Sequence, residues 1–221
     1  MHNGFARQPK TIIFDFDGVI LDSARPKTMA FAQCYAGEDE SKIAEVIRYQ
    51  ERHGGIGRQQ KFEYFEEHVF GRRVDASRIA DLCDRFASIV DKAMMDAPFV
   101  PGAEELLQRL NGCIPLHLVS GMPDGDLKLV LMRRGLVHYF SSVAGSPKKK
   151  ITEFCRILKS EQCDPKDALA VGDSRTEFDA AVELGIPFLA VVAQNAPDFF
   201  PADAVRCRDL TGFDALVALK N

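Results

Sequence analysis

Short apolar runs alternate with segments of helical periodicity along most of the 221-residue chain. The first run, 11–14, is β-branched and aromatic and leads into acidic residues and a glycine, which is typical of a buried strand leaving a sheet. Similar runs follow at 116–119, 142–144, 168–171, 188–192 and 204–205. Strands separated by helical segments indicate a parallel sheet with crossover helices. The pattern therefore predicts an α/β fold with a Rossmann-like, doubly wound parallel sheet as its core.

The segment between the first two apolar runs is far longer than one crossover requires, and it has helical periodicity without a good strand. It predicts helices at 26–36, 41–52, 58–70 and 77–95. A run rich in proline and glycine, 98–102, then ends this helical segment before the second core strand. We therefore predict an α-helical cap, residues 23–97, inserted into an α/β core formed by residues 1–22 and 98–221.

Composition narrows the classes of protein that fit this pattern. With 46% hydrophobic and 27% charged residues, the chain has the balance of a folded, soluble domain. A net charge of −4 provides no broad basic field, which argues against nucleic acid as the main partner. No apolar stretch suits a membrane span or a secretory signal. Six scattered cysteines without a Cys-x-x-Cys pair predict reduced thiols and a cytoplasmic location, whereas the oligomeric state is not determined.

Two carboxylates stand directly after the first predicted strand, in the run Asp15-Phe16-Asp17-Gly18-Val19. Ligands of open α/β sheets bind at the carboxyl ends of strands, and two like charges there call for a metal ion or a shared proton. Asp15 could attack phosphorus to form an aspartyl-phosphate, while Asp17 moves the proton. Taken alone, the run also suits an ordinary strand-to-loop turn, because Asp-Gly favours turns.

Ser120-Gly121 and the run Lys148-Lys149-Lys150 follow two later strands, so they are expected at the same edge of the sheet. The serine hydroxyl and the neighbouring amides can hold a phosphate oxygen, although the pair also suits a plain turn. A lysine at this edge can neutralise charge on a transferring group. Lys150 is the preferred candidate because it is nearest the next helix, and a solvated basic turn accounts for at least two of the three lysines.

A further acidic pair, Asp173 and Glu177, stands where a predicted strand ends and the next helix begins. Magnesium takes oxygen ligands and keeps several waters, so Asp15, the backbone carbonyl of Asp17 and Asp173 would suffice on the protein side. Glu177, one helical turn later, would hold a metal-bound water or orient Lys150. The same acidic pair also suits a helix N-cap with an acidic first turn.

The residues described above, in this order and at these strand ends, resemble the four motifs of the haloacid dehalogenase-like superfamily. Most members of that superfamily are phosphatases. The matching positions are 15–19, Ser120, Lys150 and 172–177. The resemblance spans nearly the whole chain. It implies that Asp15 is the nucleophile and Asp17 the general acid and base, that the serine and the lysine bind phosphate, and that the fourth motif completes a magnesium site.

The predicted cap is similar to the small helical caps of the subgroup that includes phosphoglycolate phosphatase and β-phosphoglucomutase. There are two departures from the family pattern. Glu177 stands where aspartate is more usual, and Lys150 lacks the following proline often seen, which leaves Lys148 and Lys149 as alternatives. In the cap, Arg58 follows a glycine-rich turn and is a candidate for substrate contact, or it simply begins a new helix after a C-cap.

The resemblance implies a magnesium-dependent phosphatase that hydrolyses a small phosphorylated metabolite, such as a sugar phosphate or a phosphoglycolate-like phosphomonoester. A phosphosugar mutase would use the same core and return the phosphoryl group to the substrate. A noncatalytic phosphometabolite-binding protein would keep the fold without turnover. Carbon–halogen hydrolysis fits less well, because that chemistry needs neither magnesium nor an acid at Asp17. The identity of the substrate is not determined by the sequence.

Overall fold

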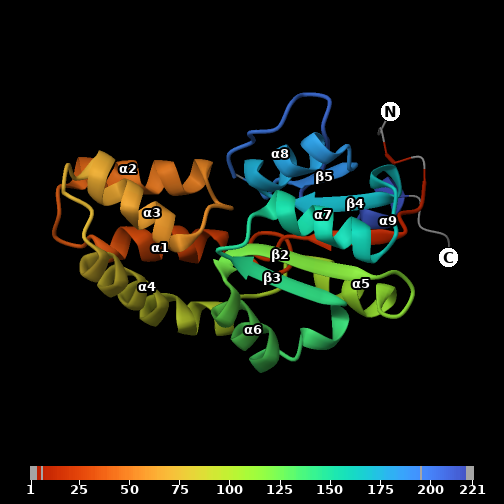
Figure 1. Cartoon of the computed structure of the whole chain (residues 1–221), viewed down its shortest axis with the longest axis horizontal. Coiled ribbons are helices and arrows are strands. Elements are labelled where there is room, and N and C mark those ends of the chain that lie inside the picture. Colours follow the sequence, from red (N-terminus) through yellow and green to blue (C-terminus); the bar gives the residue numbers. More distant parts are fainter. Residues whose placement is uncertain (1–3, 6, 195, 218–221) are drawn as a thin grey trace.

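A computed structural model describes residues 4–5, 7–194 and 196–217 (Figure 1). Its centre is a six-stranded parallel sheet in the order β3-β2-β1-β4-β5-β6. The strands are β1 (Thr11–Phe14), β2 (Leu116–Pro123), β3 (Ser142–Ser146), β4 (Ala168–Gly172), β5 (Phe188–Val191) and β6 (Val205–Cys207). The predicted doubly wound parallel sheet is confirmed. The ends of β3 to β6 differ from the predicted runs by one or two residues. The largest difference is in β2, which extends to Pro123, so Ser120 and Gly121 lie inside it, where its register against β3 shifts.

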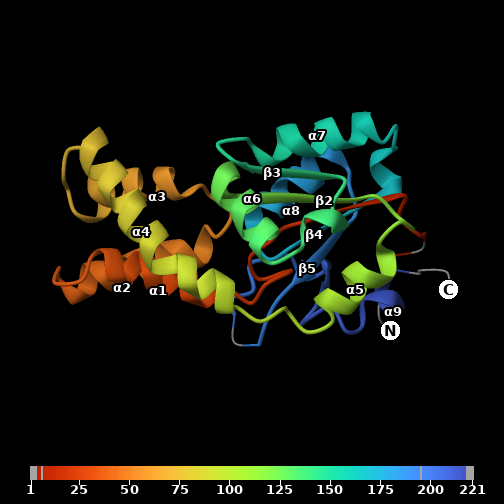
Figure 2. The same cartoon turned by 90° about the horizontal axis from the view of Figure 1, so that it is seen from below.

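Helices cover both faces of the sheet, as the apolar character of its strands requires (Figure 2). They are α5 (Ala103–Leu110), α6 (Asp124–Arg133), α7 (Lys150–Ser160), α8 (Arg175–Leu184) and α9 (Phe213–Val217). Ile12 and Phe14 of β1 pack in one buried cluster with α5, α6 and α9, whereas Ile13 packs in a second cluster with α7 and α8. Alternate residues of each strand thus fill two separate layers of the core.

A group of helices lies between β1 and α5 in the sequence and beside the sheet in space (Figure 1). It contains α1 (Ala24–Cys34), α2 (Glu40–Arg52), α3 (Arg58–Tyr64), a π-helical turn (Phe65–Val69) and α4 (Ala76–Asp96). We refer to residues 24–96 as the helical insert. Aromatic rings form its centre; the centroids of Phe31 and Phe86 lie 4.2 Å apart. The helix expected at 58–70 is present as α3 and the π-helical turn together.

The two linkers that join the insert to the sheet run side by side. The Asp22 amide donates to the Pro98 carbonyl (2.9 Å), and the Val100 amide donates to the Ile20 carbonyl (3.0 Å). Arg134 of the core donates to three carbonyls at the end of the insert, which satisfies groups that a helix end leaves unpaired. These contacts lie at the predicted boundaries of the cap. Its independence as a domain stays a prediction.

The order of the strands creates a switch point between β1 and β4, because the chain leaves β1 toward β2 and later returns to its other side. Phe14 pairs with Val171, and the Asp15 amide donates to the Val171 carbonyl (2.9 Å). Ligands of open α/β sheets bind in the crevice at such a point. The residues that follow β1 and β4 therefore share one crevice.

Two further expectations concern the surroundings of the protein. All six cysteines lie in the described part of the chain, and none of them forms a disulfide there. Within the same described ranges, each helix is too short or too polar to cross a membrane. The cytoplasmic location stays a prediction.

Candidate active site

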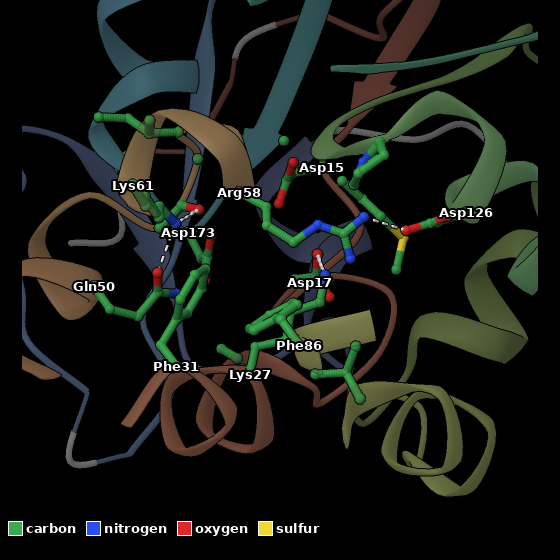
Figure 3. A pocket seen from close by; sticks show the side chains of 18 residues that line it. Asp15, Asp17, Lys27, Phe31, Gln50, Arg58, Lys61, Phe86, Asp126 and Asp173 are labelled. Carbon is green, nitrogen blue, oxygen red and sulfur yellow. Dashed lines mark hydrogen bonds and ion pairs between the residues drawn. The ribbon is translucent and has the colours of Figure 1, made fainter. Parts of the chain in front are cut away.

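A cavity of about 650 Å³ lies between the carboxyl ends of the strands and the helical insert (Figure 3). From the core it is lined by Asp15, Asp17, Gly121, Met122, Pro123, Asp126 and Asp173. From the insert it is lined by Ala24, Lys27, Phe31, Gln50, Gly54, Gly55, Ile56, Arg58, Lys61, Phe86 and Val90. Charged side chains from the core and from the insert converge on it, as is typical of a small-molecule site. Five of the residues singled out from the sequence thus meet around one cavity: Asp15, Asp17, Arg58, Gly121 and Asp173.

The Asp15 carboxylate is buried and bonded to a lysine. Lys150 Nζ lies 2.6 Å from Asp15 Oδ1. Lys148 instead pairs with Asp124 at the surface, and Lys149 is exposed. Of the three candidate lysines, Lys150 is therefore the one that reaches Asp15. Burial raises the pKa of Asp15, and the positive charge of Lys150 offsets part of that rise.

Asp17 is held by two side chains from the start of the insert. Ser23 Oγ donates to its Oδ1, and Lys27 Nζ donates to its Oδ2, both at 2.5 Å. Neither contact is evident from the motif pattern. The spacing of four residues places Ser23 and Lys27 on one side of the first turn of α1, and this spacing is the sequence signal that could have identified them.

Asp173 lies against the loop that carries the first two aspartates. Gly18 has a φ of +76°, and a Cβ at this position would overlap the Asp173 carboxylate. Burial, followed by the negative charge of Asp15, raises the pKa of Asp173 to about 8. A cation beside these carboxylates would relieve that repulsion.

The donor chemistry of this corner fits magnesium. Asp15, Asp17 and Asp173 line the same cavity, and oxygen ligands of this kind suit a hard cation that keeps several waters. Within the described ranges, no three His, Cys, Asp or Glu side chains gather as a metal cage. The Mg²⁺ site stays a prediction, with Asp15, Asp173 and the Asp17 carbonyl as its expected ligands.

Glu177 is buried behind Lys150 rather than beside the cavity. It contacts Lys150 Nζ and accepts a hydrogen bond from Ser174 Oγ. Lys150 therefore lies between two carboxylates, Asp15 and Glu177, which restrict where its ammonium group can point. Of the two roles predicted for Glu177, this arrangement favours the orientation of Lys150.

Ser120 and Gly121 stand at the neighbouring strand, as predicted. Ser120 is buried, and its Oγ accepts from the Met122 amide (3.1 Å), so its hydroxyl hydrogen remains available to a phosphate oxygen. Gly121 lines the cavity and lies under the insert, since a Cβ there would be 2.6 Å from the Gly55 carbonyl oxygen. The absence of a side chain allows the insert to approach this closely.

Arg58 reaches from the insert to the core across the cavity. Its Nη2 donates to Asp126 Oδ2 (2.8 Å), and its guanidinium lies 5.6 Å from the centroid of the Phe86 ring (Figure 3). Its position is compatible with the predicted contact to substrate, which stays a prediction.

A doubly wound sheet with several carboxylates around a cavity at its switch point, and with a helical insert beside it, defines an α/β protein whose ligand site lies at the carboxyl ends of the strands. Residues 9–185 match the family described as haloacid dehalogenase-like hydrolase. The chain belongs to this family. The prediction of an enzyme, a hydrolase of this family, is confirmed.

Curated relatives and solved structures agree with this assignment. The chain is 26% identical over 193 residues to phosphoglycolate phosphatase of Synechococcus elongatus, covering 82% of this chain and 83% of that protein. It is 27% identical over 192 residues to phosphoglycolate phosphatase of Rhodospirillum rubrum, covering 83% and 79%. Its fold is similar to that of CbbY from Rhodobacter sphaeroides in complex with phosphate, with a TM-score of 0.74, 19% identity and coverage of 96% and 100%.

Proposed function

We propose that this chain is a magnesium-dependent phosphatase that hydrolyses a small phosphomonoester metabolite, a sugar phosphate or a phosphoglycolate-like compound. The observation that carries the proposal is the buried Asp15 carboxylate, bonded to Lys150 and sharing a cavity with Asp17 and Asp173. A carboxylate held by a cation at the switch point of the sheet is suited to attack on a phosphoryl group. The phosphoglycolate phosphatase relatives support the same reaction class.

In the first step, an Asp15 carboxylate oxygen attacks phosphorus, and the bond from phosphorus to the alcohol oxygen breaks. Asp17 gives a proton to that leaving oxygen, so the products are the free alcohol and an aspartyl-phosphate. Lys150 and Ser120 bind the phosphoryl oxygens and stabilise the charge that builds on them. Ser23 and Lys27 hold the Asp17 carboxyl in position.

In the second step, Asp17 takes a proton from a water molecule as its oxygen attacks phosphorus. The bond between phosphorus and Asp15 breaks, which releases inorganic phosphate and restores the Asp15 carboxylate and the proton on Asp17. Asp15, the Asp17 carbonyl and Asp173 would hold magnesium, which supplies compensation for the negative charge of the phosphoryl group.

The test is a broad panel of phosphorylated metabolites, assayed for released inorganic phosphate with Mg²⁺ and with EDTA. The proposal expects Mg²⁺-dependent release from at least one small phosphomonoester. Released phosphate also separates hydrolysis from a mutase, which returns the phosphoryl group to the substrate. If no phosphomonoester is turned over while a control phosphatase works on the same panel, the proposal is wrong.

A further inference from the structure

Three cations line the cavity from the side of the helical insert, and two of them have carboxylate partners. Lys27 pairs with Asp17, and Arg58 pairs with Asp126. The third cation is Lys61, on the second turn of α3. Among the described residues, no carboxylate lies within ion-pair distance of Lys61 Nζ, so Lys61 is the one of these three cavity cations that lacks a carboxylate partner.

Lys61 is held in this position by neutral groups. Its Nζ donates to Gln50 Oε1 (2.6 Å) and to the Gly54 carbonyl (2.9 Å), and 2% of the residue is exposed (Figure 3). An ammonium group has three donors, and these two bonds use two of them. A buried charge without a carboxylate in direct contact is costly. Burial, reinforced by the charge of Lys27, lowers the pKa of Lys61 to about 7, although the more distant negative charges of Asp17 and Asp173 offset part of that effect.

The energetic cost of burying the Lys61 ammonium group has two possible explanations, one structural and one functional. Structurally, Lys61 ties Gln50 of α2 to the glycine-rich turn before α3. A neutral side chain could do the same without a buried charge. Functionally, a buried ammonium group that lines the cavity of the proposed phosphatase is suited to receive an anion.

We propose that Lys61 binds a second acid group of the substrate, carried on its alcohol part, while the phosphoryl group to be transferred lies at Asp15. This inference rests on the proposed function. Asp15, which is bonded to Lys150, lines the cavity from the core, and Lys61 lines it from the insert. A phosphomonoester with a carboxylate or a second phosphate therefore matches both sides, whereas a neutral alcohol part leaves the charge of Lys61 unmatched.

The first test compares substrates that carry the second acid group with substrates that lack it. The probes are 2-phosphoglycolate and its primary amide, and ethane-1,2-diol bisphosphate and ethyl phosphate. For the wild type we expect kcat/KM to favour the acid of a pair by about 10- to 100-fold, the range of one charge-assisted hydrogen bond. The pair with the larger ratio identifies whether carboxylate or phosphate is the acid group. Equal rates within both pairs would overturn the inference.

The second test changes the charge at Lys61 in two independent ways. Lys61→Met removes the ammonium group, with Lys92→Met on the exposed side of α4 as the matched control. Gln50→Glu keeps the shape and the hydrogen bond and gives Lys61 a carboxylate partner. Both changes at the site are expected to reduce the acid-to-amide ratio to about threefold or less, whereas Lys92→Met keeps the wild-type ratio.

A merely structural Lys61 predicts a different result. Gln50→Glu would then strengthen the contact and leave the ratio unchanged, and this outcome would overturn the inference even if Lys61→Met fails to fold. Circular dichroism and thermal melting establish which variants are folded. If the wild type hydrolyses the amide and ethyl phosphate as well as the acids, the inference is wrong and the proposed function stands. If it hydrolyses no phosphomonoester at all, the proposed function itself fails.

Discussion

Lys150 Nζ lies 2.6 Å from Asp15 Oδ1, although 135 residues separate the two in the chain and strand β2 lies between β1 and β3 in the sheet. Both side chains are buried, and Glu177 contacts the same ammonium group. Asp15 and Lys150 therefore form a buried ion pair at the point where the first strand ends. Its position explains how a carboxylate can remain available as a nucleophile in a cavity that otherwise raises its pKa.

Replacing Asp15 with Asn is expected to lower kcat by at least about 10³-fold, because the amide cannot attack phosphorus. The change is nearly isosteric and removes a carboxyl whose pKa burial raises, so the fold is expected to persist. Phosphate release measures the first effect, and thermal melting the second. Asp22→Asn, at an exposed carboxylate just after the motif, is the matched control. Turnover by Asp15→Asn at more than a tenth of the wild-type rate would exclude Asp15 as nucleophile.

Replacing Lys150 with Met is expected to lower kcat/KM by about 10²- to 10³-fold, because the cation beside the transferring group is lost. The same change at Lys148 or Lys149 is expected to cost threefold or less, since these side chains lie at the surface. Steady-state kinetics of the three variants with one substrate test whether Lys150 is the lysine that binds the phosphoryl group. A larger loss at Lys148 or Lys149 would contradict the assignment.

Asp173 and Glu177 are expected to differ in their effect on metal dependence. Asp173→Asn removes a proposed ligand and should raise the Mg²⁺ concentration for half-maximal activity by about tenfold or more. Glu177→Gln weakens the hold on Lys150, so it should lower kcat with a smaller change in the Mg²⁺ requirement. Titration of activity with Mg²⁺ separates the two. Equal shifts would instead indicate that Glu177 acts on the metal.

The glycine-rich turn of the insert is expected to tolerate a methyl group at one position and not at the next. At Gly55 a Cβ would overlap Thr176 Oγ1 and lie 2.7 Å from Ser174 Oγ, whereas at Gly54 it would meet Ser174 Cβ at an ordinary 3.6 Å. Gly55→Ala should therefore keep the insert away from the core and lower kcat/KM by about tenfold or more. Gly54→Ala should cost about threefold or less. Similar losses would show that close approach at Gly55 is unimportant.

The stability difference between the wild type and Lys61→Met is expected to depend on pH. Lys61 has a pKa of about 7 in the folded protein against 10.5 for an ordinary lysine, so between these values the unfolded chain binds more protons than the native state. The stability of the wild type therefore rises with pH in this window, because the buried lysine becomes neutral. Relative to the variant, the wild type should gain about 2 kcal/mol between roughly pH 6.5 and 9.

Urea unfolding of both proteins without phosphate or Mg²⁺ measures this difference at each pH. The comparison cancels every group that titrates alike in the two proteins. A constant difference across the range would mean that Lys61 keeps an ordinary pKa, and its charge would then be matched by a group other than those near it in the structure.

The alternation of apolar runs and helical segments was sufficient to predict the parallel sheet and the helical insert, because each strand must be buried on both faces and each helix on one. The motif residues Asp15, Ser120, Lys150 and Asp173 were also identifiable from the chain. They follow strands, and the carboxyl ends of parallel strands share one edge. The choice among the three lysines came only from the structure, since their neighbours in the sequence are nearly the same.

The partners of the insert's cations were decided by tertiary structure alone. Lys27 bonds Asp17, Arg58 bonds Asp126 and Lys61 bonds Gln50, and nothing in the local pattern distinguishes these cations from solvated ones. The hydrophobic periodicity of a helix indicates which of its residues face the core. It does not indicate which charged residues of other elements those side chains contact. The sequence therefore determined the candidate reacting groups and the edge of the sheet where they stand. How the insert packs against the core determined which cation was left without a counter-charge, because that depends on distances between segments far apart in the chain.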